Sequence, residues 1–135
     1  MALVVKMPAS QVRVKVTDID LDFFNSNILD TKKQDGGFLG KLPVIIKFYA
    51  DWWGPCKVLS PILDELANDC KGKINFYKIN VETNQELSAL FGVRGVPLMV
   101  LVSKDIEPVV IPSIPDKDNL VELINDILNK DINDN

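Results

Sequence analysis

The thiols of Cys56 and Cys70 are the side chains in this sequence best suited to covalent chemistry. The chain has 135 residues and no histidine. Imidazole general bases, imidazole metal sites, histidine pH switches and the nucleophilic Ser-His-Asp and Cys-His systems are therefore excluded. Thiol-disulfide exchange remains, in which one thiolate attacks a disulfide and a second thiol resolves the mixed disulfide. Neither a cofactor nor a metal site is predicted.

The two cysteines cannot form a disulfide with each other if they share one helix. The sequence predicts a helix from Pro55 to about Cys70, because proline suits the first helical position and Lys71-Gly72 supplies a stop. Fourteen residues at a rise of about 1.5 Å place their Cα atoms about 21 Å apart. A disulfide requires less than about 7 Å. Cys70, which has no chemical neighbours in sequence, is interpreted as structural.

Composition and charge fit one globular domain over residues 1–135, with residues 1–10 and 130–135 poorly ordered. Apolar residues make up 47% and charged residues 25% of the chain, so it can bury a core. The net charge of -4 argues against nucleic acid as a partner. No segment has the length and apolarity of a signal peptide or a membrane-spanning helix, so we expect no membrane association and a cytoplasmic location.

Hydrophobic periodicity predicts an α/β domain with a mixed sheet flanked by helices on both faces. Val58, Ile62 and Leu66 should form the inner stripe of the second helix, and Thr83 to Glu86 has capping-box spacing. Prolines on both sides of the last strand indicate a sheet edge. The expected strands are 12–16, 44–50, 74–81, 98–102 and 109–111, and the expected helices are 18–29, 55–70, 83–91 and 116–129.

Two segments at these positions resemble the thioredoxin family. Residues 52–57 read Trp-Trp-Gly-Pro-Cys-Lys after a buried strand, and residues 92–97 read Gly-Val-Arg-Gly-Val-Pro before another. The resemblance extends over roughly Val16 to Leu128 and implies the thioredoxin fold. It also implies a protein of cell redox homeostasis, related to disulfide oxidoreductases. In this family the active turn reads Trp-Cys-Gly-Pro-Cys-Lys.

This chain departs from the family at the residue that attacks the substrate disulfide, because Trp53 stands in its place. The dithiol cycle therefore cannot run on the chain alone. Two interpretations remain for Cys56, the candidate catalytic residue. Its place in the first helical turn favours a reactive thiolate. In the family, however, this cysteine is the more buried one, which favours a packed and inert thiol.

A second departure concerns Lys47, which stands where family members usually carry a buried aspartate that accepts a proton from the resolving cysteine. Lys78 matches the lysine that faces this position. A lysine at this position must extend outward to solvent or lose its proton, because burial can lower a lysine pKa by roughly 3–5 units. Lys47 either biases Cys56 towards thiolate or is tolerated because the proton relay is no longer used.

The recognition surface of the family, by contrast, is retained. We call Trp52, Trp53, Gly54, Pro55, Val96 and Pro97 the candidate peptide face. Val96-Pro97 matches the cis-proline loop of the family, whose backbone pairs with an extended substrate segment. Three interpretations remain open for Trp53: it binds a partner, it folds back over the empty site, or it is an introduced substitution.

Three functions follow from these expectations. The first is a module that binds a protein or peptide at the Trp52/Trp53/Pro97 face without dithiol-disulfide turnover. The second is a monothiol redox protein in which Cys56 forms mixed disulfides with glutathione or another thiol protein. The third is a structural domain of a larger assembly.

Overall fold

The computed structural model describes residues 16–30, 37–50, 54–104, 106–111 and 116–133, with side chains except at 54–60 and 128–133. The expected order of elements is confirmed. In chain order the elements are β1 (Thr17–Asp18), α1 (Leu21–Asn27), β2 (Val44–Tyr49), α2 (Gly54–Asp69), β3 (Asn75–Asn80), α3 (Gln85–Leu90), β4 (Leu98–Val102), β5 (Val109–Ile111) and α4 (Lys117–Asn133).

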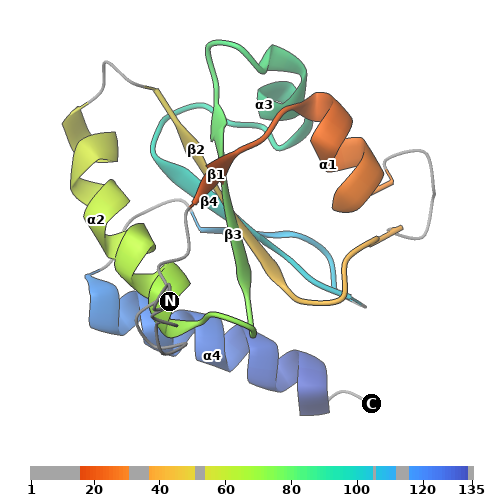
Figure 1. Ribbon diagram of the computed structural model, residues 1–135, viewed down its shortest axis with the longest axis vertical. Helices are drawn as coiled ribbons and strands as arrows, with labels where there is room; N and C mark the ends of the chain where they lie inside the picture. Colours follow the sequence, from red (N-terminus) through yellow and green to blue (C-terminus); the bar gives the residue numbers. More distant parts are fainter. Residues whose placement is uncertain (1–15, 31–36, 51–53, 105, 112–115, 134–135) are drawn as a thin grey trace, which may run out of the picture.

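The described strands form one mixed sheet in the order β1-β3-β2-β4-β5 (Figure 1). β1, β3 and β2 run parallel, whereas β4 pairs antiparallel with both β2 and β5. β4, which is all apolar, and β2, which is apolar except for Lys47 and Tyr49, therefore lie inside the sheet, as their sequences predict. β5 lies at an edge, also as predicted, and the carboxyl ends of β1, β2 and β3 meet at one end of the sheet.

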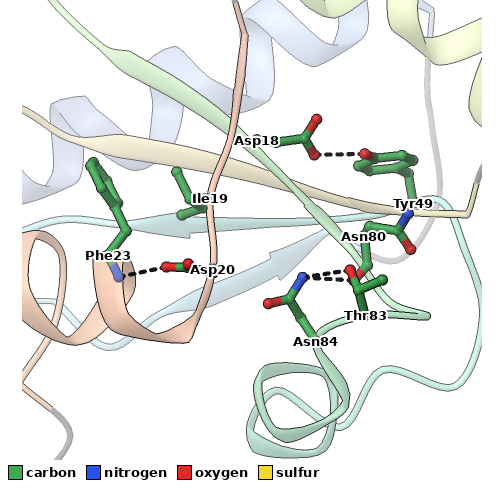
Figure 2. A pocket seen from close by; sticks show the side chains of 8 residues that line it. All are labelled: Asp18, Ile19, Asp20, Phe23, Tyr49, Asn80, Thr83 and Asn84. Atoms are coloured by element: carbon green, nitrogen blue, oxygen red, sulfur yellow. Dashed lines mark hydrogen bonds between the residues drawn. The ribbon is translucent and has the colours of Figure 1, made fainter.

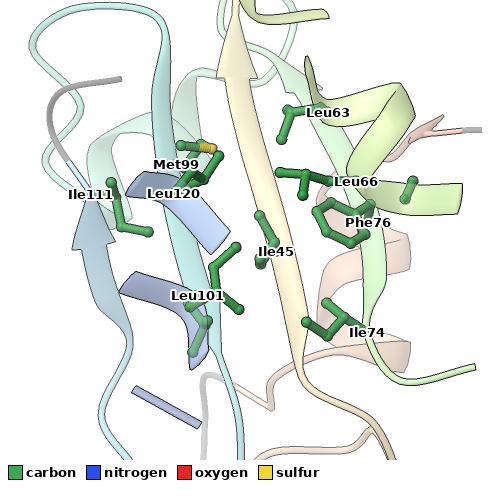
Figure 3. Packing of buried hydrophobic residues seen from close by; sticks show 11 residues of the cluster. Ile45, Leu63, Leu66, Ile74, Phe76, Met99, Leu101, Ile111 and Leu120 are labelled. Carbon is green, nitrogen blue, oxygen red and sulfur yellow. The ribbon is translucent and has the colours of Figure 1, made fainter. Parts of the chain in front are cut away.

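One face of the sheet is covered by α2 and α4, and Figure 3 shows this core around Ile45 and Phe76. Two residues of the expected stripe of α2 face this core: Leu66 is buried, and Ile62 is half-buried and packs against it. Leu63, which the expected stripe did not include, is also buried. Val58 lies outside the described side chains. Substituting alanine for a buried leucine in such a core costs about 2–5 kcal/mol.

The opposite face is covered by α1 and α3 around Phe24, Phe48 and Leu87, which are fully buried. Phe91 joins this core, its ring centroid lying 5.6 Å from those of Phe24 and Phe48. Leu90, also on α3, is 53% exposed.

The start of the chain differs from the sequence prediction. The first strand of the described residues is Thr17–Asp18. Of the predicted strand 12–16 only Val16 is described, and it belongs to no strand. α1 begins at Leu21 and not at Asp18, because Asp20 is its N-cap and accepts a hydrogen bond from the Phe23 N–H at 2.8 Å. Pairing with β3 at the sheet edge therefore overrides the helical pattern at Asp18.

Two other helix ends also differ from prediction. The capping box at Thr83 does not form, because α3 has Asn84 as its N-cap and makes no side-chain cap hydrogen bond there. α4 continues past the expected end at Asn129 to Asn133. Residues 1–10, expected to be poorly ordered, lie outside the described residues.

Candidate functional site

The two cysteines lie at opposite ends of α2. Cys56 is in the first turn of the helix, and Cys70 directly follows its last residue. The Cys70 N–H donates to the Leu66 carbonyl at 2.8 Å, so the helical hydrogen bonding reaches Cys70. The shared helix that the sequence predicts is thus present. It separates the Cα atoms of Cys56 and Cys70 by about 21 Å, which excludes a disulfide between the two residues. Cys70 is a free thiol.

Cys70 is poorly suited to nucleophilic chemistry. It packs against the core formed by α2 and α4 and is half-buried. Burial raises the pKa of its thiol above the ordinary value, and the negative charge of Asp69 raises this pKa further. Lys73 and Lys117 act in the opposite direction but are weaker influences. Because the thiolate is the reactive form, this environment supports the structural interpretation of Cys70.

The candidate peptide face is partly described. Trp52 and Trp53 lie outside the described residues, and Gly54 and Pro55 are described only as backbone at the start of α2. Val96 and Pro97 are half-buried, and the peptide bond between them is cis.

Strand pairing brings Pro97 to the carboxyl end of β2. Phe48 pairs with Leu98, the residue that follows Pro97. β2 ends at Tyr49, and the short segment after it leads to Gly54. Val96-Pro97 therefore lies at the end of β2 from which the chain continues to α2 (Figure 1).

Lys47 lies in the middle of β2, with Lys78 of β3 and Met99 of β4 as its register partners. Lys47 is only 3% exposed, so it does not extend to solvent. Its Nζ lies 5.3 Å from the centroid of the Tyr49 ring, and the Nζ of Lys78 lies 5.5 Å from the same centroid. A buried lysine thus stands beside another lysine on the sheet face that is covered by α2.

Sequence reasoning missed two residues that complete this group. The Tyr49 hydroxyl donates to Asp18 Oδ1 at 2.6 Å, and Lys78 Nζ lies 3.6 Å from Asp18 Oδ2. Family members usually carry an aspartate on β2 at the position that Lys47 occupies here. In this chain Asp18 supplies a carboxylate near that position from β1. The apolar-polar pattern gives no signal for this contact, because it depends on β1 pairing with β3.

Asp18 and Tyr49 also line a surface pocket of about 530 Å³, shown in Figure 2. Asp18, Tyr49 and Asn80 are the last residues of β1, β2 and β3, so the pocket opens at the carboxyl ends of three parallel strands. The remaining lining residues come from the start of α1 and from the turn between β3 and α3, and they are Ile19, Asp20, Phe23, Thr83 and Asn84.

Within the described part of the chain, no group of three or more acidic or cysteine side chains is placed to hold a metal ion. Over the same ranges, no helix combines the length and the apolar character that crossing a bilayer requires.

The family model described as Thioredoxin matches residues 22–126, a range that runs from α1 into α4 and includes the cis Val96-Pro97 bond. The chain belongs to the thioredoxin family. Thioredoxin from Pseudomonas aeruginosa is 39% identical over 88 residues, which cover 65% of this chain and 70% of that protein. Thioredoxin from Rickettsia felis is 31% identical over 100 residues, or 74% and 95% of the two chains. Thioredoxin from Borreliella burgdorferi is 35% identical over 104 residues, or 76% and 89%.

Proposed function

We propose that this thioredoxin-family protein binds extended protein segments at the candidate peptide face without dithiol-disulfide turnover. The observation that carries the proposal is the position of the thiols. Trp53 precedes α2 where the family has its attacking cysteine, and the chain's other cysteine, Cys70, is a helix length away from Cys56. Attack and resolution need two thiols that can reach each other, and α2 keeps this pair apart.

Three features support retention of binding. Proteins of this family interact with protein substrates, and the pairing of Phe48 with Leu98 places Val96-Pro97 at the carboxyl end of β2. Trp52 and Trp53 add two tryptophans to this face, and tryptophan is a frequent anchor of interfaces. The buried Lys47 is consistent with a proton relay that is no longer used.

A probe without free thiols separates binding from redox chemistry. We would titrate the protein with reduced insulin B chain whose cysteines are alkylated, and follow the titration by isothermal calorimetry. We expect saturable binding that is weakened about tenfold or more by Trp53→Ala, as for an interface anchor. Leu123→Ala is the matched control, because Leu123 is 37% exposed and lies on α4, away from the start of α2. Absence of saturable binding, or equal losses in both variants, would refute the proposal.

The position of Cys56 in the first turn of α2 favours one second candidate, a monothiol redox function. Exposed N–H groups at a helix start stabilise a thiolate, which can form mixed disulfides with glutathione or a thiol protein. Iodoacetamide labelling of the Cys70→Ser variant tests this function at the remaining thiol. If Cys56 in the native variant is labelled faster than free cysteine is, the monothiol function is supported. If Cys56 is labelled only after unfolding, the monothiol function is ruled out.

A further inference from the structure

The pocket at the ends of β1, β2 and β3 has a position that favours ligand binding. In α/β proteins, ligands bind in crevices beyond the carboxyl ends of parallel strands. Here each of three neighbouring parallel strands contributes its last residue, namely Asp18, Tyr49 and Asn80. The pocket also lies at the carboxyl end of β2, the end to which the pairing of Phe48 with Leu98 brings Pro97.

The lining of the pocket is polar and rich in hydrogen-bond acceptors. Six of its eight lining residues have polar side chains, two of these are aspartates, and no lysine or arginine is among the eight. One oxygen of Asp20 accepts from the Phe23 N–H, and its other oxygen accepts no hydrogen bond from a described residue. Asp18 adds a second carboxylate, which is held by the Tyr49 hydroxyl and by Lys78.

The amide of Asn84 is oriented by its neighbours. Its Nδ2 donates to the Asn80 carbonyl at 3.0 Å and to Thr83 Oγ1 at 3.1 Å. These bonds use both amide hydrogens and leave Oδ1 as an acceptor. Figure 2 shows this oxygen on the side of the pocket towards Asp20. Acceptors therefore approach the pocket from the start of α1 and from the turn before α3.

We propose that this pocket binds the guanidinium group of an arginine in the protein segment that occupies the candidate peptide face. A guanidinium is a planar cation with five N–H donors, so it can satisfy several acceptors at once. The net charge of -4 favours a basic segment over an acidic one. Since the arginine belongs to the bound segment, this inference rests on the proposed function.

The pocket is within reach of a segment at Pro97. Phe48 pairs with Leu98 on one side of β2, and Tyr49 pairs with Asn80 on the other. Pro97 and the pocket thus flank the carboxyl end of β2, and neighbouring strands are about 4.8 Å apart. We therefore expect an arginine one or two residues along an extended segment from Pro97 to reach the pocket.

A charge-only substitution tests the inference. Asp20→Asn removes the charge but keeps the helix cap, because asparagine is as good an N-cap as aspartate. Asp22→Asn is the matched control, since Asp22 is an exposed residue of the same helix that does not line the pocket. The probes are nine-residue peptides of alanine and serine with a central leucine. Each carries one arginine, or its neutral analogue citrulline, at a successive position.

We expect arginine to bind about two- to fivefold more tightly than citrulline at one or two positions, as for a half-exposed ion pair. This preference should disappear in Asp20→Asn and persist in Asp22→Asn. If the peptides bind without an arginine preference, or if the two variants behave alike, the pocket inference is wrong while the proposed function stands.

A second arm does not need the candidate peptide face. In an NMR titration, N-acetylarginine amide should shift the backbone amides of Asn80 to Asn84 more than N-acetylcitrulline amide does. If it does so while no peptide and no alkylated insulin B chain binds, the pocket is a guanidinium site and the proposed function is wrong. Equal shifts from the two compounds would overturn the pocket inference.

Discussion

The hydrogen bond between Tyr49 and Asp18 links the two strands that flank β3, and its strength can be measured directly. A hydroxyl donating to a carboxylate at 2.6 Å is a short, charge-assisted contact. Hydrogen bonds to charged groups contribute about 1.5–3 kcal/mol. The Asp18 side chain is 55% exposed, so solvent reduces this contribution to about 1 kcal/mol. Tyr49→Phe should therefore lower the free energy of unfolding by about 1 kcal/mol and Tm by about 4 °C.

Urea unfolding of a double-mutant cycle isolates this contact. Asp18→Ala also breaks the ion pair with Lys78. Because Tyr49→Phe keeps the ring that lies near Lys78, we expect that loss to cancel from the cycle. The coupling energy between Tyr49→Phe and Asp18→Ala should be about 0.5–1 kcal/mol. Tyr77→Phe is the matched control and should change stability by less than about 0.5 kcal/mol, because no described residue bonds its hydroxyl. A coupling energy near zero would refute the reasoning.

Two further predictions concern the thiols. Trp53→Cys should form a disulfide with Cys56 on oxidation, detectable by mass spectrometry, but should gain only part of the reductase activity of the family because Lys47 replaces the proton acceptor. Full activity would show that Lys47 does not limit the reaction. Iodoacetamide should label Cys70 more slowly than free cysteine at pH 8, since burial and Asp69 raise the pKa of this thiol. Asp69→Asn should accelerate labelling by lowering that pKa, and an unchanged or slower rate would contradict this electrostatic explanation.

The elements that the sequence predicted well are those whose pattern reflects burial on the sheet. β4 is a continuous apolar run, β2 is one interrupted by Lys47, and both lie inside the sheet. The strand at Thr17–Asp18 was missed because two exposed polar residues at an edge leave no apolar pattern. Its position is set by pairing with Tyr77 and Lys78, which are distant in sequence.

The candidate site was predictable only in part, for the same reason. The sequence places Cys56 and Cys70 on one helix, and it places Val96-Pro97 before a buried strand. It does not place Asp18 beside Tyr49, because that contact crosses from β1 to β2 over β3. The pocket was likewise out of reach, since its three strand ends meet only through the sheet order.

The central claim is that this protein keeps the thioredoxin fold but does not turn over disulfides. Reduction of insulin disulfides, with thioredoxin reductase and NADPH or with a small dithiol as reductant, tests this claim most directly. We predict that the unaltered chain produces no rate above the background without protein, whereas Trp53→Cys produces a measurable one. Robust catalysis by the unaltered chain would contradict the account, because it would mean that Cys56 completes the reaction without a second thiol in its active turn.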